Sequence, residues 1–306
     1  MNKLVYKVTT AVSSAALLTG SVASVAFGTT TVTVSGNGAD STNTANVSMT
    51  SSKQISQVNN ANIENNVNID ANTGDNTANK NTGGDVNIST GDANVSSSVS
   101  NSANSNSASL GCGGCPGDAS IKISGNGAYS DNDANVQLAS KTVVAQENNA
   151  QVENDIDVDA NTGDNDADKN TGGDVEIETG DSEVEVDVTN ALNQNVARIG
   201  GGNGGSVDVE ISGNGANSDN TVNLSLENDL LVVQENNADI ENNIDVDAET
   251  VDNSADKNTG GEVHIDTGDA DVEVSVANNA NFNGLDLSDC DCEMDLDVKV
   301  AGNGAD

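Results

Sequence analysis

The sequence predicts an all-β fold, a tandem-repeat β-solenoid. The first observation behind this prediction is a 36-residue block that occurs three times and opens at Gln57, Gln146 and Gln234. The copies start 89 and then 88 residues apart, so the chain is an array of similar units. The three blocks cover residues 57–92, 146–181 and 234–269.

The second observation is strict alternation of small or apolar residues with polar ones. In the middle block, Ala150, Val152, Asn154, Ile156 and Val158 share one face of an extended chain. No segment has helical periodicity, and proline occurs only once. The alternation therefore predicts strands throughout the repeats.

The third observation is the scarcity of aromatic residues. Beyond residue 28 only Tyr129 and Phe282 are aromatic. Three tandem β-sandwich modules of about 90 residues are the alternative fold, but a sandwich normally buries several large side chains. A solenoid core is narrow and can be filled by Val, Ile, Ala, Thr and Asn, with inward Asn and Thr forming hydrogen-bonded ladders. We expect each unit to form four coils of about 22 residues.

The N-terminal residues 1–28 have the features of a secretory signal peptide. Lys3 and Lys7 precede an uncharged, apolar stretch from Val8 to Val25, and small residues follow at a cleavage position. An N-terminal membrane anchor is the alternative. The signal peptide predicts an exported protein that is extracellular or bound to the cell surface.

The repeats divide the remaining chain into units. Unit 1 covers residues 29–123, unit 2 covers 124–211 and unit 3 covers 212–300, and residues 301–306 repeat the start of a fourth unit. Each unit carries a Ser-Gly-Asn-Gly-Ala turn that follows a short strand, because Gly and Asn supply the backbone angles of tight turns.

The longest alternating segment follows that turn. Residues 146–160 would span about 50 Å as one strand, which exceeds the usual length. We therefore expect a bend inside the segment, marked by Asn148 and Asn154, and a polar corner near Ser140 and Lys141.

Charge increases along the array. Residues 35–123 hold 7 acids and 3 bases, residues 124–211 hold 19 and 3, and residues 212–300 hold 22 and 2. The net charges are therefore −4, −16 and −20. Such a chain repels nucleic acid and anionic lipid and attracts cations. The alternative is that the charge only keeps a surface soluble.

Calcium is the candidate ligand, because oxygen side chains alternate around a Gly turn in the middle block, as hard cations require. The first block has fewer acids there, and the third has Val251 in place of the Gly. The pattern lacks the spacing of an EF-hand loop, and the alternative is that these acids form the wet face of a strand. No other cofactor is expected. The candidate metal residues are Asp70, Asp75, Asp157, Asp159, Asp164, Asp166, Asp247 and Asp252.

Four cysteines lie between the blocks, at Cys112, Cys115, Cys290 and Cys292. In an exported chain, disulfides are favoured over a zinc site. Local bridges and cross-links between neighbouring molecules both remain open, so the pairing is not assigned.

No catalytic constellation occurs in the sequence, and we expect the protein not to be an enzyme. The one histidine, His264, replaces the Asn87 and Glu176 of the other copies and is expected to face solvent. Lys80, Lys169 and Lys257 recur in all three copies before Asn-Thr-Gly and are expected at polar corners.

The phrases Gln-x-Asn-x-Ala-x-Val-x-Asn and Gly-x-Asn-Thr-Ala resemble curlin repeats of secreted bacterial surface fibres. The resemblance covers a few residues per unit, and the aromatic positions and the short period of curlin repeats are absent. It implies a secreted structural protein of the cell surface or an extracellular fibre. Because residues 298–306 repeat the beginning of the first unit, we expect the protein to be its own partner in a head-to-tail polymer. The alternative is a calcium-binding adhesin or surface stalk module that contacts other cell-surface components.

Overall fold

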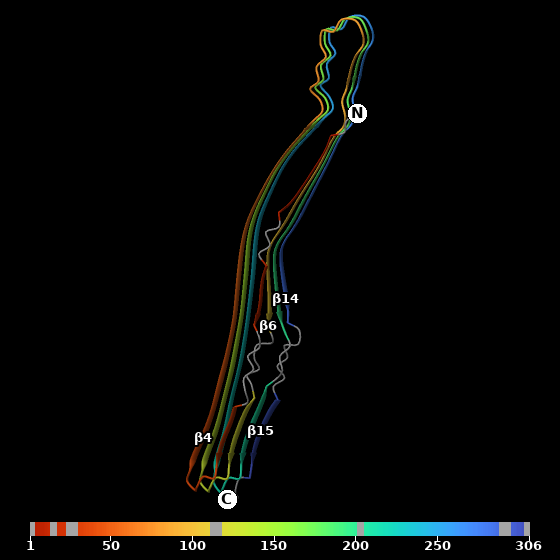
Figure 1. Ribbon diagram of the computed structural model, residues 1–306. Helices are drawn as coiled ribbons and strands as arrows, with labels where there is room; N and C mark the ends of the chain where they lie inside the picture. Colours follow the sequence, from red (N-terminus) through yellow and green to blue (C-terminus); the bar gives the residue numbers. More distant parts are fainter. Residues whose placement is uncertain are drawn as a thin grey trace.

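The computed structural model describes residues 4–12, 17–22, 30–110, 118–200, 205–287 and 295–302. Within these ranges every regular element is a β-strand. The strands form a long, thin stack in which the chain runs from a base to a distant tip and returns (Figure 1). The all-β solenoid prediction is confirmed.

Each repeat unit forms one coil of the solenoid. A coil begins with a short base strand and continues as a 31-residue strand to the tip. It then turns through a four-residue tip strand and returns along a fourth strand. Coil 1 contains β3 (Thr30–Ser35), β4 (Thr42–Asn72), β5 (Val86–Ser89) and β6 (Ala93–Leu110). Coil 2 contains β7 (Ala119–Ser124), β8 (Asp131–Asn161), β9 (Val175–Glu178) and β10 (Ser182–Ile199). Coil 3 contains β11 (Ser206–Ser212), β12 (Asp219–Glu249), β13 (Val263–Asp266) and β14 (Ala270–Asp286), and β15 (Asp295–Ala301) follows it.

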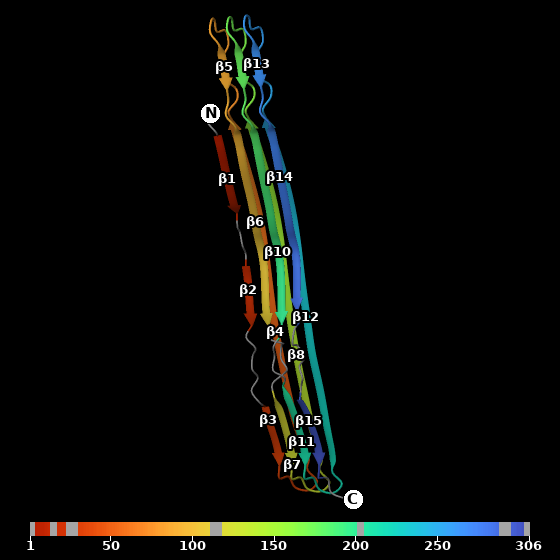
Figure 2. The same cartoon turned by 90° about the vertical axis from the view of Figure 1, so that its right-hand side faces the viewer.

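Equivalent strands of successive coils pair in parallel, as Figure 2 shows for β5, β9 and β13 at the tip. Gln57 pairs with Gln146 and Gln146 with Gln234, so the register equals the repeat length. The expected four coils per unit are therefore wrong, because one 88- or 89-residue unit closes a single wide coil. The sandwich alternative is also excluded, since its units would pair strands within themselves.

The expected bend in the long segment is wrong as well. β8 runs unbroken through Ser140 and Lys141 and through both marker asparagines. Asn148 and Asn154 point into the core and are 0% exposed. They need no corner because the neighbouring coils satisfy their amides.

Those amides form ladders along the stack. Asn154 accepts from Asn65 Nδ2 at 2.6 Å and from Asn101 Nδ2 at 3.0 Å, and it donates to Asn242 Oδ1 at 2.6 Å. The ladder thus links the long sheet to the return sheet as well as coil to coil. Asn148 forms a second ladder of the same kind, and Gln146 donates to Gln57 Oε1 at 2.7 Å. Buried amides with partners on every side specify register, because any slip would leave them unsatisfied.

Apolar layers alternate with the amide layers. Near the tip end, Ile156 and Val158 of β8 pack between Val67 and Ile69 of β4 and the valines of β6 and β10. Each buried Ile or Val contributes about 1.5–3 kcal/mol. The predicted thin aliphatic core is therefore present.

A bulge keeps the return strand facing inward. Asn104, Asn193 and Asn281 have positive φ values of 59°, 58° and 64°. At Asn104 and Asn193 two successive residues face inward, so the inward parity changes, and Asn193 Nδ2 donates to the carbonyl of Asn237 at 2.6 Å. A side-chain amide suits this left-handed position because Asn tolerates it better than most residues.

Two N-terminal strands, β1 (Leu4–Val12) and β2 (Leu17–Val22), pair with β6. They use an 88- or 89-residue offset, like the strands of a coil. They belong to the predicted signal peptide, whose cleavage positions lie outside the described residues.

The two ends of the stack differ. Val184 of β10 is 1% exposed, whereas its coil 3 equivalent Val272 is 50% exposed. The exposed large apolar side chains of the described residues, Val58 and Tyr129 apart, all belong to coil 3 and β15. Coil 3 therefore ends the stack with an open strand edge and an uncovered inner face.

Candidate functional site

The acidic candidates meet where the long strands end at the tip turn, a region we call the neck. Asp70, Asp159 and Asp247 pair in register on the outer face, so their backbones lie about 4.8 Å apart. The pKa of Asp159 is raised, first by burial and then by the charges of Asp70 and Asp247, with Asp157 and Asp164 adding to the effect. Like charges of neighbouring coils therefore repel each other in the neck.

The turn that follows Asp70, Asp159 and Asp247 has different hydrogen bonds in coil 3 from those in coils 1 and 2. In coil 2, Asn161 donates from Nδ2 to Asp164 Oδ2 at 2.7 Å and accepts from the Gly163 amide at 2.6 Å. Coil 1 repeats the arrangement with Asn72 and Asp75.

In coil 3 the carboxylate Glu249 replaces this amide donor. The pKa of Glu249 is raised, first by Asp247 and then by burial, with Asp164, Asp252 and Asp159 also contributing. A hard cation at this point would neutralise several charges that coils 1 and 2 relieve with amides. Among the described residues, no three Asp, Glu, His or Cys side chains form a ready-made metal site.

The eight predicted metal residues are thus only partly grouped. The charges of Asp70, Asp157, Asp164 and Asp247 act on Asp159, and Asp252 joins them through Glu249. Asp75 occupies the equivalent turn of coil 1. Asp166 instead lies beyond the neck, where Asn79 Nδ2 donates to it at 2.7 Å.

Sequence reasoning missed Glu249, because its candidates were aspartates of the middle block and their equivalents, and the middle block has Asn161 at this position. The replacement of Asn72 and Asn161 by Glu was the available signal.

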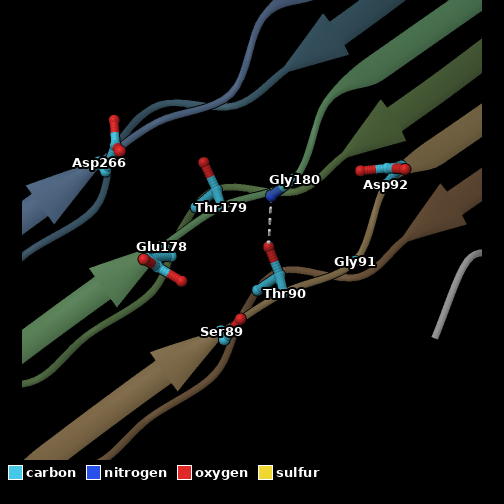
Figure 3. Close-up of a pocket in the computed structure, with 8 residues that line it drawn as sticks. All are labelled: Ser89, Thr90, Gly91, Asp92, Glu178, Thr179, Gly180 and Asp266. Carbon is cyan, nitrogen blue, oxygen red and sulfur yellow. Dashed lines mark hydrogen bonds between the residues drawn. The ribbon is translucent and has the colours of Figure 1, made fainter. Parts of the chain in front are cut away.

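A small cleft of about 180 Å³ opens at the corner between the tip strands and the return strands (Figure 3). Thr90 Oγ1 accepts from the Gly180 amide at 3.1 Å, which ties the corners of coils 1 and 2 together. Carboxylates of Asp92, Glu178 and Asp266 line the cleft from three coils. They add a second acidic position at the tip.

A larger open hollow of about 590 Å³ lies across the long sheet nearer the base. Its polar lining is an exposed ladder in which Asn223 donates to Asn135 and Asn135 to Asn46, each at 2.8 Å. None of its lining residues is titratable, so acid–base chemistry has no donor there.

The remaining predicted positions have structural surroundings. His264 lies exposed on β13 and pairs in register with Glu176. Lys80, Lys169 and Lys257 occupy left-handed positions of the tip turns, with φ values of 63°, 59° and 58°. The backbone N–H of Lys169 also donates to the carbonyl of Asp256 at 2.8 Å. Cys112, Cys115, Cys290 and Cys292 lie outside the described residues.

Models of protein families, curated protein sequences and solved structures were compared with the chain, and none of them matches it. The described part of the chain contains no helix with the length and apolarity needed to cross a membrane.

Proposed function

We propose that this protein is a secreted, non-enzymatic structural protein of the cell surface or of an extracellular fibre, and that its copies assemble head to tail. The observation that carries the proposal is the open edge of coil 3. Its inner face presents the valines that each earlier coil buries against its successor.

The apolar residues give the size of the driving force. Val272, Val274 and Val276 are about half exposed, whereas the matching Val184, Val186 and Val188 are buried. Covering each such side chain would contribute about 1–2 kcal/mol. An unpaired parallel edge also offers a row of backbone donors and acceptors to another strand. A second copy supplies both kinds of contact in the register the coils already use.

The base of the stack restricts how two copies join. Its sheet has the order β15-β11-β7-β3, four strands, whereas the long sheet has three. In a head-to-tail junction, β4 of the second copy pairs with β12 of the first. The β3 strand of the second copy would then pair with β11, at the position that β15 of the first copy already occupies. Either β15 of the first copy or β3 of the second copy must therefore be displaced from the base sheet at each junction.

The N-terminal strands impose a second condition. β1 and β2 pair with the edge of β6 that β14 of another copy would use. Head-to-tail assembly therefore requires removal of residues 1–28, which processing of the predicted signal peptide would accomplish.

The direct test compares two purified proteins, residues 29–306 and residues 1–306, by negative-stain electron microscopy and sedimentation. We expect filaments from residues 29–306 and short particles from the full chain. Monomers of residues 29–306 at high concentration, with and without reductant, would contradict the proposal.

A calcium-binding surface module is the second candidate. It is favoured by the neck, where Asp70, Asp159 and Asp247 pair in register. Burial and then these neighbouring charges raise the pKa of Asp159, and the charge of Asp247 raises the pKa of Glu249. This function is compatible with a single three-coil particle and needs no polymer.

A further inference from the structure

Residues that pair in register across the three coils form columns on the outer face. Along one column the coils carry side chains of different chemistry. Coil 1 carries amides and hydroxyls where coil 2 carries acids, and the two kinds of side chain bond across the junction. Asn68 Nδ2 donates to Asp157 Oδ2 at 3.3 Å, and Ser96 Oγ donates to Glu185 Oε2 at 3.5 Å.

Coil 3 continues those columns with acids. Asp245 follows Asp157, Asp271 follows Glu183 and Glu273 follows Glu185. The paired backbones that carry these carboxylates lie about 4.8 Å apart, so a fourth acidic coil would extend the repulsion between like charges.

We infer that the partner of the open coil 3 edge is the coil 1 edge of a second copy, selected by its amide and hydroxyl columns. This inference rests on the proposed head-to-tail function. At such a junction Asp245 meets Asn68 of the second copy, Asp271 meets Asn94 and Glu273 meets Ser96. Two coil 3 edges would instead bring together two units of net charge −20.

The direction of donation is compatible with this junction. Asn243 of coil 3 donates from Nδ2 to Asp155 Oδ1 of coil 2 at 3.0 Å. An amide therefore reaches a carboxylate in the preceding coil as well as in the following one. Coil 1 of the second copy would donate to coil 3 in that same sense.

The rise in acidity along the chain thus gives the assembly its polarity. The least acidic coil lies at one end and the most acidic at the other. Opposite ends are complementary, and like ends repel.

The test is a variant of residues 29–306 with Asn68→Asp, Asn94→Glu and Ser96→Glu. These are the residue types that coil 2 carries in the same columns, and the junction of coils 2 and 3 already accommodates acid beside acid. The control variant carries Gln137→Glu, Gln151→Glu and Thr189→Glu, which add the same charge to the outer face of the middle coil.

At low salt and pH 7 we expect the junction variant to assemble about tenfold more slowly than the control, and about 0.5 M NaCl to restore its rate. Circular dichroism melting verifies that both variants fold. If the triple variant does not fold, Asn68→Asp alone should still require more salt than wild type for half-maximal assembly.

The outcomes separate the two proposals. Failure of wild-type residues 29–306 to assemble contradicts the proposed function. Assembly of wild type, with the junction variant matching the control at low salt, refutes only the inference about polarity.

Discussion

At the junction of coils 1 and 2, buried Asn65 donates to Asn154, and at the junction of coils 2 and 3 Asn154 donates in turn to Asn242. Both bonds measure 2.6 Å, so the interior treats the two junctions alike. Outside, Asn68 meets Asp157 at the first junction, whereas Asp157 meets Asp245 at the second. The interior therefore fixes the register, and the exterior is free to change charge from coil to coil.

The largest effect should come from breaking the interior that both junctions share. Asn154→Ala removes three buried hydrogen bonds and leaves amides of Asn65, Asn101 and Asn242 without that partner. We expect a loss of about 3–5 kcal/mol of unfolding free energy, because orphaned buried polar groups cost about 1–3 kcal/mol each. Urea denaturation measures it. Glu153→Ala, one residue earlier on the outer face, is the control, and equal losses in the two variants would contradict the role given to the ladder.

A smaller effect should fall on one junction alone. A Cβ on Gly163 would clash with the carbonyl oxygen of Val251, so Gly163→Ala must push the neck of coils 2 and 3 apart. We expect a loss of about 1–3 kcal/mol, with hydrogen exchange accelerated in coil 3 more than in coil 1. Gly38→Ala is the control, since a Cβ there meets nothing within 4 Å. Uniform acceleration throughout the chain would oppose a local cause.

The same position predicts that the side chain of Val251 hinders assembly. The added Cβ of Gly74 and of Gly163 points at the following coil, and Val251 carries a real side chain at that position. Val251→Gly should therefore lower the concentration at which residues 29–306 form filaments, while leaving the melting temperature nearly unchanged. Sedimentation across a concentration series measures this, and an unchanged threshold would show that the tip turn does not limit growth.

A still smaller effect should come from the pH dependence of stability that Glu249 causes on the outer face of coil 3. Glu249 has a raised pKa, so the folded state binds its proton more tightly than the unfolded state does. Its ionisation therefore removes stability as pH rises above its ordinary value of 4.5 through the raised value. Glu249→Gln should raise the melting temperature at pH 7, and the difference should vanish at low pH where wild-type Glu249 is protonated.

Glu210→Gln provides the opposite sign. A hydrogen bond from Lys122 lowers the pKa of Glu210, so its charge stabilises the fold above its ordinary pKa and the variant should melt lower at pH 7. The same response from both variants would show that the pKa shifts do not control the pH dependence.

The smallest expected effect is that of calcium on the neck. Millimolar calcium should raise the melting temperature of wild type relative to sodium chloride of equal ionic strength, because it neutralises Asp159, Asp247 and Glu249 together. The shift should shrink in Asp159→Asn. Equal melting in calcium and in chelator would remove the calcium hypothesis.

Much of the fold could be predicted from the sequence, because a tandem repeat compares its own positions. The alternation around Ala150 and Val152 identifies the inner face, and the sequence predicts ladders of inward Asn. Asn148 and Asn154 themselves, however, are predicted to mark a bend rather than to belong to the ladders. The width of the coil could not be predicted, since it depends on which residues pair across 88 or 89 positions. Inward asparagines also resemble corner residues until their partners are known.

The candidate site was less predictable for the same reason. The neck joins Asp159, Asp247 and Glu249 from different coils, and their proximity comes from the register rather than from local spacing. A search within one unit finds alternating acids but cannot determine which of them repel each other.

Each coil crosses the full length of the molecule twice, between base turns such as Gly125–Gly127 and a tip beyond Asn161. A pulling force applied between base and tip is therefore carried by covalent backbone in every long strand at once. A force along the stacking direction is carried only by hydrogen bonds and side-chain contacts, which are individually weak. The molecule should consequently resist tension strongly along its strands and yield by separation of coils when pulled across them.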